Sequence, residues 1–189
     1  YGHSWDIRST KEFNGVWHIQ AKIAKDNPRL SSTLVNSAPE GLLFALIDIQ
    51  QRSVVKDFIQ NGYEIPYNTS GSYEFKIVAG DENYINQMIE EILSVIPEEY
   101  SLKQNYPNPF NPTTNIDFTV PATGPVELVI YNIMGQRIRT LRSGNIKYGY
   151  HSVQWNGLDD RGLHVSSGVY FSELMARGFR QTRKMLLLK

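Results

Sequence analysis

The stretch VWHIQAKI at residues 16–23 decides the fold class. Its apolar residues occupy alternate positions, namely Trp17, Ile19, Ala21 and Ile23. Because successive side chains of a strand point to opposite faces, this period of two predicts a β-strand with one buried face. The stretch YEFKI at residues 73–77 repeats the pattern. The first half of the chain is therefore predicted to contain β-structure.

Further runs of the first half support the same interpretation. Residues 42–49 are apolar almost throughout, which is typical of a central strand that is covered on both faces. Turn-forming residues separate the runs, for example at 39–41, 61–62 and 70–71. Many short strands with frequent turns predict a β-sandwich.

The period of the pattern changes after residue 80. The apolar residues of 81–96 recur every three or four positions, which places them on one stripe of an amphipathic helix. Asp81 is the expected N-cap, and Pro97 is expected to end the helix.

A proline-dense stretch follows, QNYPNPFNP at residues 104–112. Three prolines in six residues favour an extended, stiff connector over a helix or a sheet interior. Alternating strands resume in 116–120, 126–130 and 151–155. We therefore predict an all-β fold of two sandwich domains, at residues 1–80 and 100–189, with a helix and linker at 81–99.

Composition limits the classes of function. Of 189 residues, 41% are hydrophobic and 20% are charged, which is typical of a globular protein. Nineteen basic residues balance 19 acidic ones, so no net field attracts nucleic acid or anionic lipid. There is no cysteine, and no apolar run approaches the ~20 residues of a membrane-spanning helix. Because the chain opens at Tyr1 without an initiator methionine, we expect it to be part of a larger protein.

Candidate catalytic and metal-binding residues form no known pattern. Asp159 and Asp160 offer carboxylates to calcium, but a complete calcium loop needs six or more oxygens, which favours a turn. Asp48, Asp57 and Glu64 have no spacing that selects a carboxylate pair. We expect no enzyme activity, no cofactor and no metal.

The histidines show no zinc-binding spacing either; they are His3, His18, His151 and His164. His151 shares its predicted strand face with Val153 and Trp155, so we expect a hydrogen-bonded core or edge residue.

The second half carries an ordered set of motifs that ends at the C-terminus. They are LKQNYPNPFNP (102–112), IYN (130–132), MGQ (134–136), WNG (155–157), DDRG (159–162), SGVYF (167–171) and KMLLLK (184–189). This half resembles the sorting domain of type IX (Por) secretion, in the variant related to the immunoglobulin-like domain of flagellar hook-capping proteins. The first half is similar to an immunoglobulin-like segment that often precedes such domains. The resemblance thus implies that both sandwiches are immunoglobulin-like.

The resemblance also implies a function. In this family the C-terminal domain of an exported protein is recognised by the outer-membrane translocon, and a sortase-like surface peptidase joins the cargo to anionic lipopolysaccharide. Secretion to the cell surface through the periplasm is therefore expected. The residues expected to be recognised are Pro107, Asn108, Pro109, Phe110, Gly168, Tyr170, Lys184 and Lys189. Phe110 is interpreted as a core anchor in preference to an exposed docking residue.

A second interpretation belongs to a different class of protein. The first domain could be a binding module for polysaccharide or another cell-surface ligand, with Trp5, Trp17 and several tyrosines as a stacking platform. Aromatic residues on strands more often belong to the core, which favours the sorting interpretation.

Overall fold

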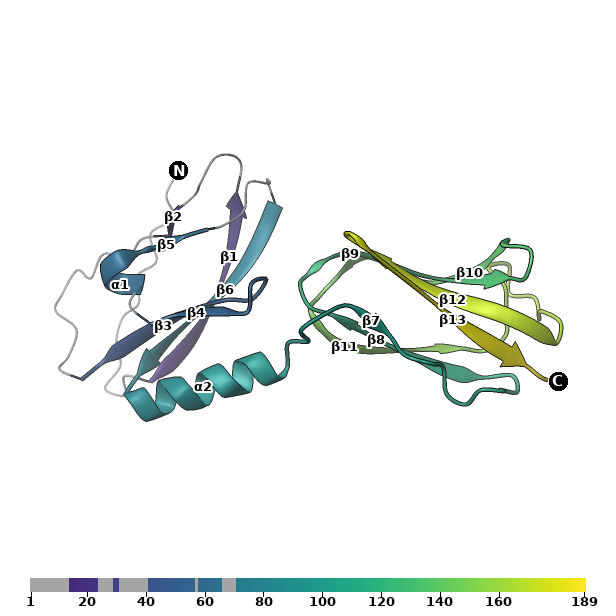
Figure 1. The fold of residues 1–189 in the computed structure, drawn as a ribbon, viewed down its shortest axis with the longest axis horizontal. Coiled ribbons are helices and arrows are strands. Elements are labelled where there is room, and N and C mark those ends of the chain that lie inside the picture. The colour runs from purple at the N-terminus through teal and green to yellow at the C-terminus, as the bar shows by residue number, and fades with distance from the viewer. Residues whose placement is uncertain (1–13, 24–28, 31–40, 57, 66–70) are drawn as a thin grey trace. The chain divides into compact units, whose positions relative to one another are not determined.

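The computed structural model describes residues 14–23, 29–30, 41–56, 58–65 and 71–189. The chain divides into two compact units, residues 1–93 and 94–189, and each is described by itself (Figure 1). The described residues form mainly antiparallel strands, so the predicted all-β class is confirmed.

The first unit contains a four-stranded antiparallel sheet in the order β1-β6-β3-β4. Its strands are β1 (Gly15–Ile23), β3 (Leu43–Asp48), β4 (Ser53–Val55) and β6 (Gly71–Gly80). Trp17 lies opposite Ile77 and Ile19 opposite Phe75, so the apolar positions of the two alternating stretches share one face. The strand predicted from residues 42–49 lies inside the sheet, between β6 and β4, as its apolar run indicates.

Short elements complete the described part of this unit. Strand β2 (Arg29–Leu30) pairs with β5 (Tyr63–Glu64), and helix α1 (Phe58–Asn61) precedes β5. One face of the sheet packs into a core with α1 and the chain around β5; its buried members are Leu46, Phe58, Ile65, Tyr73, Phe75 and Ile77.

Helix α2 (Glu82–Ser94) forms where the helical period predicts it. The carboxylate of Asp81 accepts a hydrogen bond from the backbone N–H of Tyr84 at 2.8 Å, which confirms the predicted N-cap. Figure 1 shows α2 alongside the sheet. Two side chains that flank β4 form hydrogen bonds with it. Arg52 donates to the carbonyl of Leu93 at 3.3 Å, and Lys56 donates to the side chain of Asn86 at 3.0 Å.

The second unit is a sandwich of two sheets, visible as two layers in Figure 1. One sheet has the order β10-β9-β12-β13 and the other the order β11-β8-β7. The strands are β7 (Ser101–Leu102), β8 (Thr114–Val120), β9 (Gly124–Asn132), β10 (Arg137–Ile146), β11 (Gly149–Trp155), β12 (Gly168–Ala176) and β13 (Phe179–Leu187).

Inward side chains from both sheets form the core of this sandwich. They include Ile116, Phe118 and Val120 of β8, which alternate with exposed neighbours except at Thr119. Trp155 is fully buried at the end of β11, and its indole N–H donates to the carbonyl of Leu158 at 3.0 Å. The ring is thus anchored by a hydrogen bond as well as by packing.

The proline-dense stretch lies inside the second unit, whereas its composition predicted a connector. Tyr106 forms a β-bridge with Asn115, and Phe110 forms one with Leu187. These backbone pairings, made on both sides of Pro107 and Pro109, hold the stretch against the sandwich. Residues 104–112 are called the closure segment below.

Candidate functional site

The predicted recognition residues gather at one end of the second unit, around the end of β13. Gly168 and Tyr170 of β12 lie opposite Leu187 and Met185 of β13. Phe110 pairs with the same end of β13 from the other side. Residues that are about 80 positions apart in the sequence are therefore neighbours in the structure.

The side chain of Asn108 binds the exposed edge of β13. Its Oδ1 accepts a hydrogen bond from the backbone N–H of Leu186 at 2.9 Å, and its Nδ2 donates to the carbonyl of Lys184 at 3.4 Å. The side-chain amide thus takes the place of a peptide group of a neighbouring strand. The amide of Gln104 donates to the same carbonyl at 2.7 Å. Such contacts cover part of an edge that would otherwise offer unpaired groups to another chain.

Phe110 continues the pairing with its main chain. Its N–H donates to the carbonyl of Leu186 at 3.0 Å, and its carbonyl accepts from the N–H of Leu188 at 2.9 Å. The side chain is 2% exposed and packs on Trp155, with ring centroids 5.5 Å apart. The interpretation of Phe110 as a core anchor is confirmed.

The turn of the closure segment is built around a buried asparagine. Nδ2 of Asn105 donates to the carbonyl of Pro107 and to Oγ1 of Thr114, both at 2.9 Å. Thr114 also donates to the carbonyl of Pro107 at 2.8 Å. The rings of Pro107 and Pro109 themselves are exposed. The buried amide therefore fixes the loop, while the prolines face solvent.

The remaining recognition candidates contribute in different ways. Tyr170 packs edge-on against Trp155 at 5.2 Å, and its hydroxyl donates to the carbonyl of Ser166 at 2.8 Å. Burial raises the pKa of Tyr170 above its ordinary value. Lys184 and Lys189 are exposed; the backbone N–H of Lys189 donates to Oγ of Ser167 at 3.1 Å.

Gly157 approaches the closure segment closely. Its φ is +70°, and a Cβ at this position would lie 3.3 Å from the carbonyl oxygen of Pro112 and 3.7 Å from Cδ2 of Leu187. A side chain is thus disfavoured both by the backbone conformation and by the available space.

The loop with paired aspartates is a turn. Oδ1 of Asp159 accepts from the N–H of Leu163 at 2.8 Å and of Arg161 at 2.9 Å. The hydrogen bond from the Leu163 backbone, aided by Arg161, lowers the pKa of Asp159 below its ordinary value. Asp160 instead accepts from the N–H of Thr140 at 3.1 Å. The turn interpretation is confirmed, and no metal-binding group of three or more His, Asp or Glu side chains occurs among the described residues.

The other polar candidates also have structural partners. Asp48 is buried and accepts from the hydroxyl of Tyr63 at 2.8 Å; burial raises the pKa of Tyr63 to about 12. His151 stacks on Phe118 at 5.1 Å, in agreement with its predicted place in the core or at an edge. Asp57 lies outside the described residues.

Of the aromatic platform predicted on the first unit, Trp17 is partly buried and packs against the core of that unit. Trp5 lies outside the described residues. Within the described part of the chain, no helix is both long and apolar enough to cross a membrane.

Residues 108–177 match the FlgD Ig-like domain. The matched region lies entirely in the second unit and extends from Asn108 past the end of β12. The second unit is therefore an immunoglobulin-like sandwich. No curated protein matches the chain.

Three solved structures are similar to the chain at low identity. PorZ, a surface component of the type IX secretion system of Porphyromonas gingivalis, is 19% identical over 49% of this chain and 12% of its own, with a TM-score of 0.33. Latent PorU from the same organism is 12% identical over 94% of this chain and 18% of its own, with a TM-score of 0.39. The DNA glycosylase AlkC of Pseudomonas fluorescens is 15% identical over 55% of this chain and 34% of its own, with a TM-score of 0.34.

This chain thus spans about a third or less of the length of each of these proteins. With TM-scores of at most 0.39, these likenesses carry no argument about function.

Proposed function

We propose that this chain is the C-terminal sorting and surface-attachment module of a larger exported bacterial protein, recognised by the outer-membrane translocon of type IX secretion. In this proposal the chain has no catalytic activity of its own. A sortase-like surface peptidase then acts near the module, and the cargo becomes attached to anionic lipopolysaccharide at the cell surface.

One observation carries the proposal. The motif residues that resemble the sorting domain come together with the last strand of the chain, through the contacts of Asn108 and Phe110 with residues 184–188. A partner that reads a folded module needs recognition residues on one continuous surface. The exposed Pro107, Asn108, Pro109 and Lys184, which lie beside the end of β13, offer such a surface. The order of the motifs along residues 102–189 gives independent support.

Export of a reporter tests the proposal. The reporter follows a signal peptide and precedes residues 1–189, and the host has a type IX system that exports its own sorting domains. We expect the reporter at the cell surface. The substitution Asn108→Ala should reduce surface display, because it removes both side-chain hydrogen bonds to β13 and alters the exposed surface.

Asn145→Ala is the matched control, since Asn145 is also exposed but lies in β10. Its display should equal that of the unsubstituted chain. If the unsubstituted fusion remains in the periplasm of a competent host, the proposal is wrong. Equal display by Asn108→Ala and Asn145→Ala would show that the closure segment is not recognised.

A further inference from the structure

The outward face of the three-stranded sheet of the second unit combines polar side chains with exposed tyrosines. Ile116 and Phe118 of β8 point into the core, so Asn115, Asp117 and Thr119 lie on the opposite face of the strand. Asn115 and Asp117 are exposed there, whereas Thr119 is buried and its hydroxyl forms hydrogen bonds with Ser101 and the carbonyl of Glu99. Residues directly opposite one another on paired strands share a face. The pairings below therefore define one surface, called the β8 face.

On one side of β8, strand β11 adds three side chains to this face. Tyr150 lies opposite Thr119, Ser152 opposite Asp117, and Gln154 opposite Asn115. All three β11 residues are exposed.

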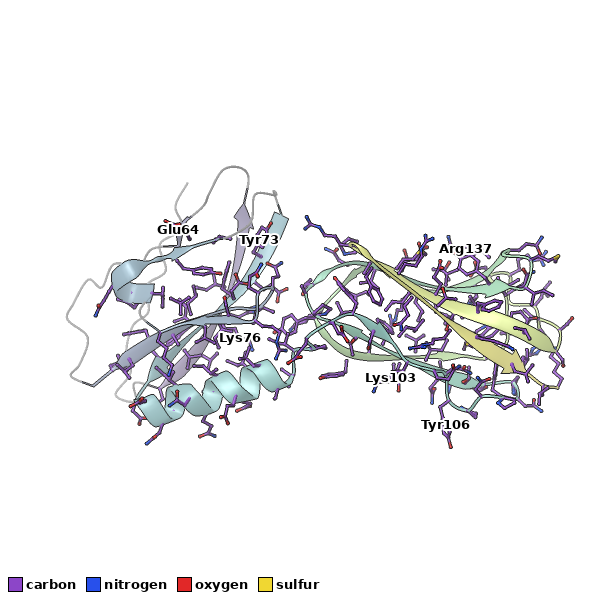
Figure 2. The ribbon with its side chains drawn as sticks, viewed as in Figure 1. Glu64, Tyr73, Lys76, Lys103, Tyr106 and Arg137 are labelled. Carbon is purple, nitrogen blue, oxygen red and sulfur yellow. The ribbon has the colours of Figure 1, made fainter. Side chains whose placement is uncertain are left out.

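On the other side, the chain around β7 adds further outward residues. Ser101 lies opposite Thr119, and the N–H of Lys103 donates to the carbonyl of Asp117 at 2.9 Å. Tyr106 bridges to Asn115. Figure 2 shows Lys103 and Tyr106 on the same side of the second unit.

The two tyrosines stand at opposite corners of the β8 face. Tyr106 is 81% exposed and Tyr150 is 65% exposed, so each ring offers a face to a ligand. They lie beside Asn115 and Thr119, four positions apart along β8, and on opposite sides of that strand. With ~3.4 Å per residue and ~4.8 Å between strands, their backbones are about 17 Å apart. This distance accommodates several rings of an extended sugar chain.

A shallow depression of about 240 Å³ lies on this face, with Lys103, Asp117, Thr119, Tyr150 and Ser152 in its lining. Pockets that enclose a small molecule measure about 300–1,000 Å³. At this smaller volume, the depression could hold one ring of a ligand that lies across the sheet. The rest of the ligand would lie outside the depression.

The chemistry of the face selects the class of ligand. Lys103 and Asp117 are its charged residues and cancel one another, so the face lacks the surplus of one charge that would attract an anionic or cationic partner. The exposed amide of Gln154 and hydroxyl of Ser152 can both donate and accept hydrogen bonds, as sugar hydroxyls do. Tyrosine combines an apolar ring, on which the C–H face of a sugar can stack, with a polar hydroxyl.

We propose that the β8 face binds a neutral polysaccharide, with Tyr106 and Tyr150 stacking on sugar rings and the polar residues between them binding hydroxyl groups. The site does not use the contacts of Asn108 or Phe110 with β13. The β8 face therefore gives the second unit a binding activity in addition to export. At the cell surface, the module would bind glycan through this face.

Affinity electrophoresis of the full chain in gels that contain soluble β-glucan, mannan or xylan tests the proposal. At least one of these neutral glycans should retard the chain. Tyr150→Ala and Tyr106→Ala should each weaken that binding by roughly fivefold or more, which corresponds to about 1 kcal/mol. Met134→Ala is the control, because Met134 is 72% exposed on the β9–β10 turn, outside the β8 face. Its binding should be unchanged, as should the melting temperature of all three variants.

Three results would overturn the proposal. The first is that none of the three neutral glycans retards the chain. The second is that Tyr150→Ala and Tyr106→Ala bind like the unsubstituted chain, which would place any binding elsewhere. The third is that retardation occurs only with an anionic polysaccharide and disappears at high salt, since an electrostatic partner is then the ligand.

Discussion

Replacement of Phe110 by alanine tests whether the closure segment belongs to the core of the second unit. The side chain is 2% exposed, and its ring packs on Trp155. Truncation of a buried phenylalanine to alanine costs about 3–5 kcal/mol. That is a large part of the roughly 5–15 kcal/mol that stabilises a domain. Since about 1 kcal/mol shifts the melting temperature of a domain of this size by roughly 4–8 °C, we expect a decrease of at least about 12 °C.

Differential scanning calorimetry of the full chain measures this shift, and hydrogen exchange with mass spectrometry assigns it to a unit. Peptides from residues 94–189 should lose protection, while peptides from 41–93 should keep it. Asn111→Ala is the matched control, because Asn111 is exposed in the same segment. A decrease below about 4 °C for Phe110→Ala, or an equal loss of protection in both units, would refute the reasoning.

Four further predictions follow from the second unit and its boundary. Deletion of residues 184–189 should abolish the cooperative melt of the second unit measured by circular dichroism, because Met185 and Leu187 are fully buried; a melt within a few degrees of the intact chain would contradict this. Gly157→Ala should destabilise that unit by about 1–2 kcal/mol in urea titrations, owing to its positive φ and the nearby Pro112; an unchanged midpoint would argue against the close approach. A Glu-specific protease should cut first at the exposed Glu98–Glu99, a few residues after the boundary at 93/94, as read by mass spectrometry, and first cuts at Glu127 or Glu173 would be inconsistent with the boundary. The pKa of Asp159 is lowered on folding from 3.8, so its contribution to stability is present above about pH 4 and is lost as the pH falls below that value; Asp159→Asn should flatten the acid side of the melting-temperature profile, and an unchanged profile would contradict the assignment.

Local patterns were sufficient to predict the elements of the fold. The alternation in residues 16–23 and 73–77 corresponds to β1 and β6, and Asp81 caps α2 as expected. Each of these signals depends on side chains that lie a few positions apart in sequence. The spacing of apolar residues therefore shows whether a helix or a strand would bury them all on one face.

The place of the closure segment could not be predicted in this way. Proline content indicated an extended connector, but the partners of Asn108 and Phe110 are in residues 184–188, more than 70 positions away. Composition does not show which distant strand a segment will pair with. Only the apolar character of Phe110 among polar neighbours indicated that part of the stretch would be buried.

The candidate site was likewise predicted in part. The recognition residues follow from a resemblance, which does not indicate that Asn105 is buried or that the Asn108 side chain takes the place of a peptide group. The sequence gives little indication that Asn105 is buried, since asparagine is common in exposed turns. Tyr106 and Tyr150 were also missed as a pair, because their shared face depends on the register of β8 with its two neighbours.

The central claim is recognition by the translocon, and the most direct measurement compares two isogenic strains. The reporter fused to residues 1–189 is expressed in a type IX host and in the same host without the outer-membrane translocon, and its surface and periplasmic fractions are quantified. We predict mainly surface reporter in the first strain and only folded periplasmic reporter in the second. The same surface fraction in both strains, or periplasmic reporter in both while a sorting domain of the host is exported in the first, would contradict the account.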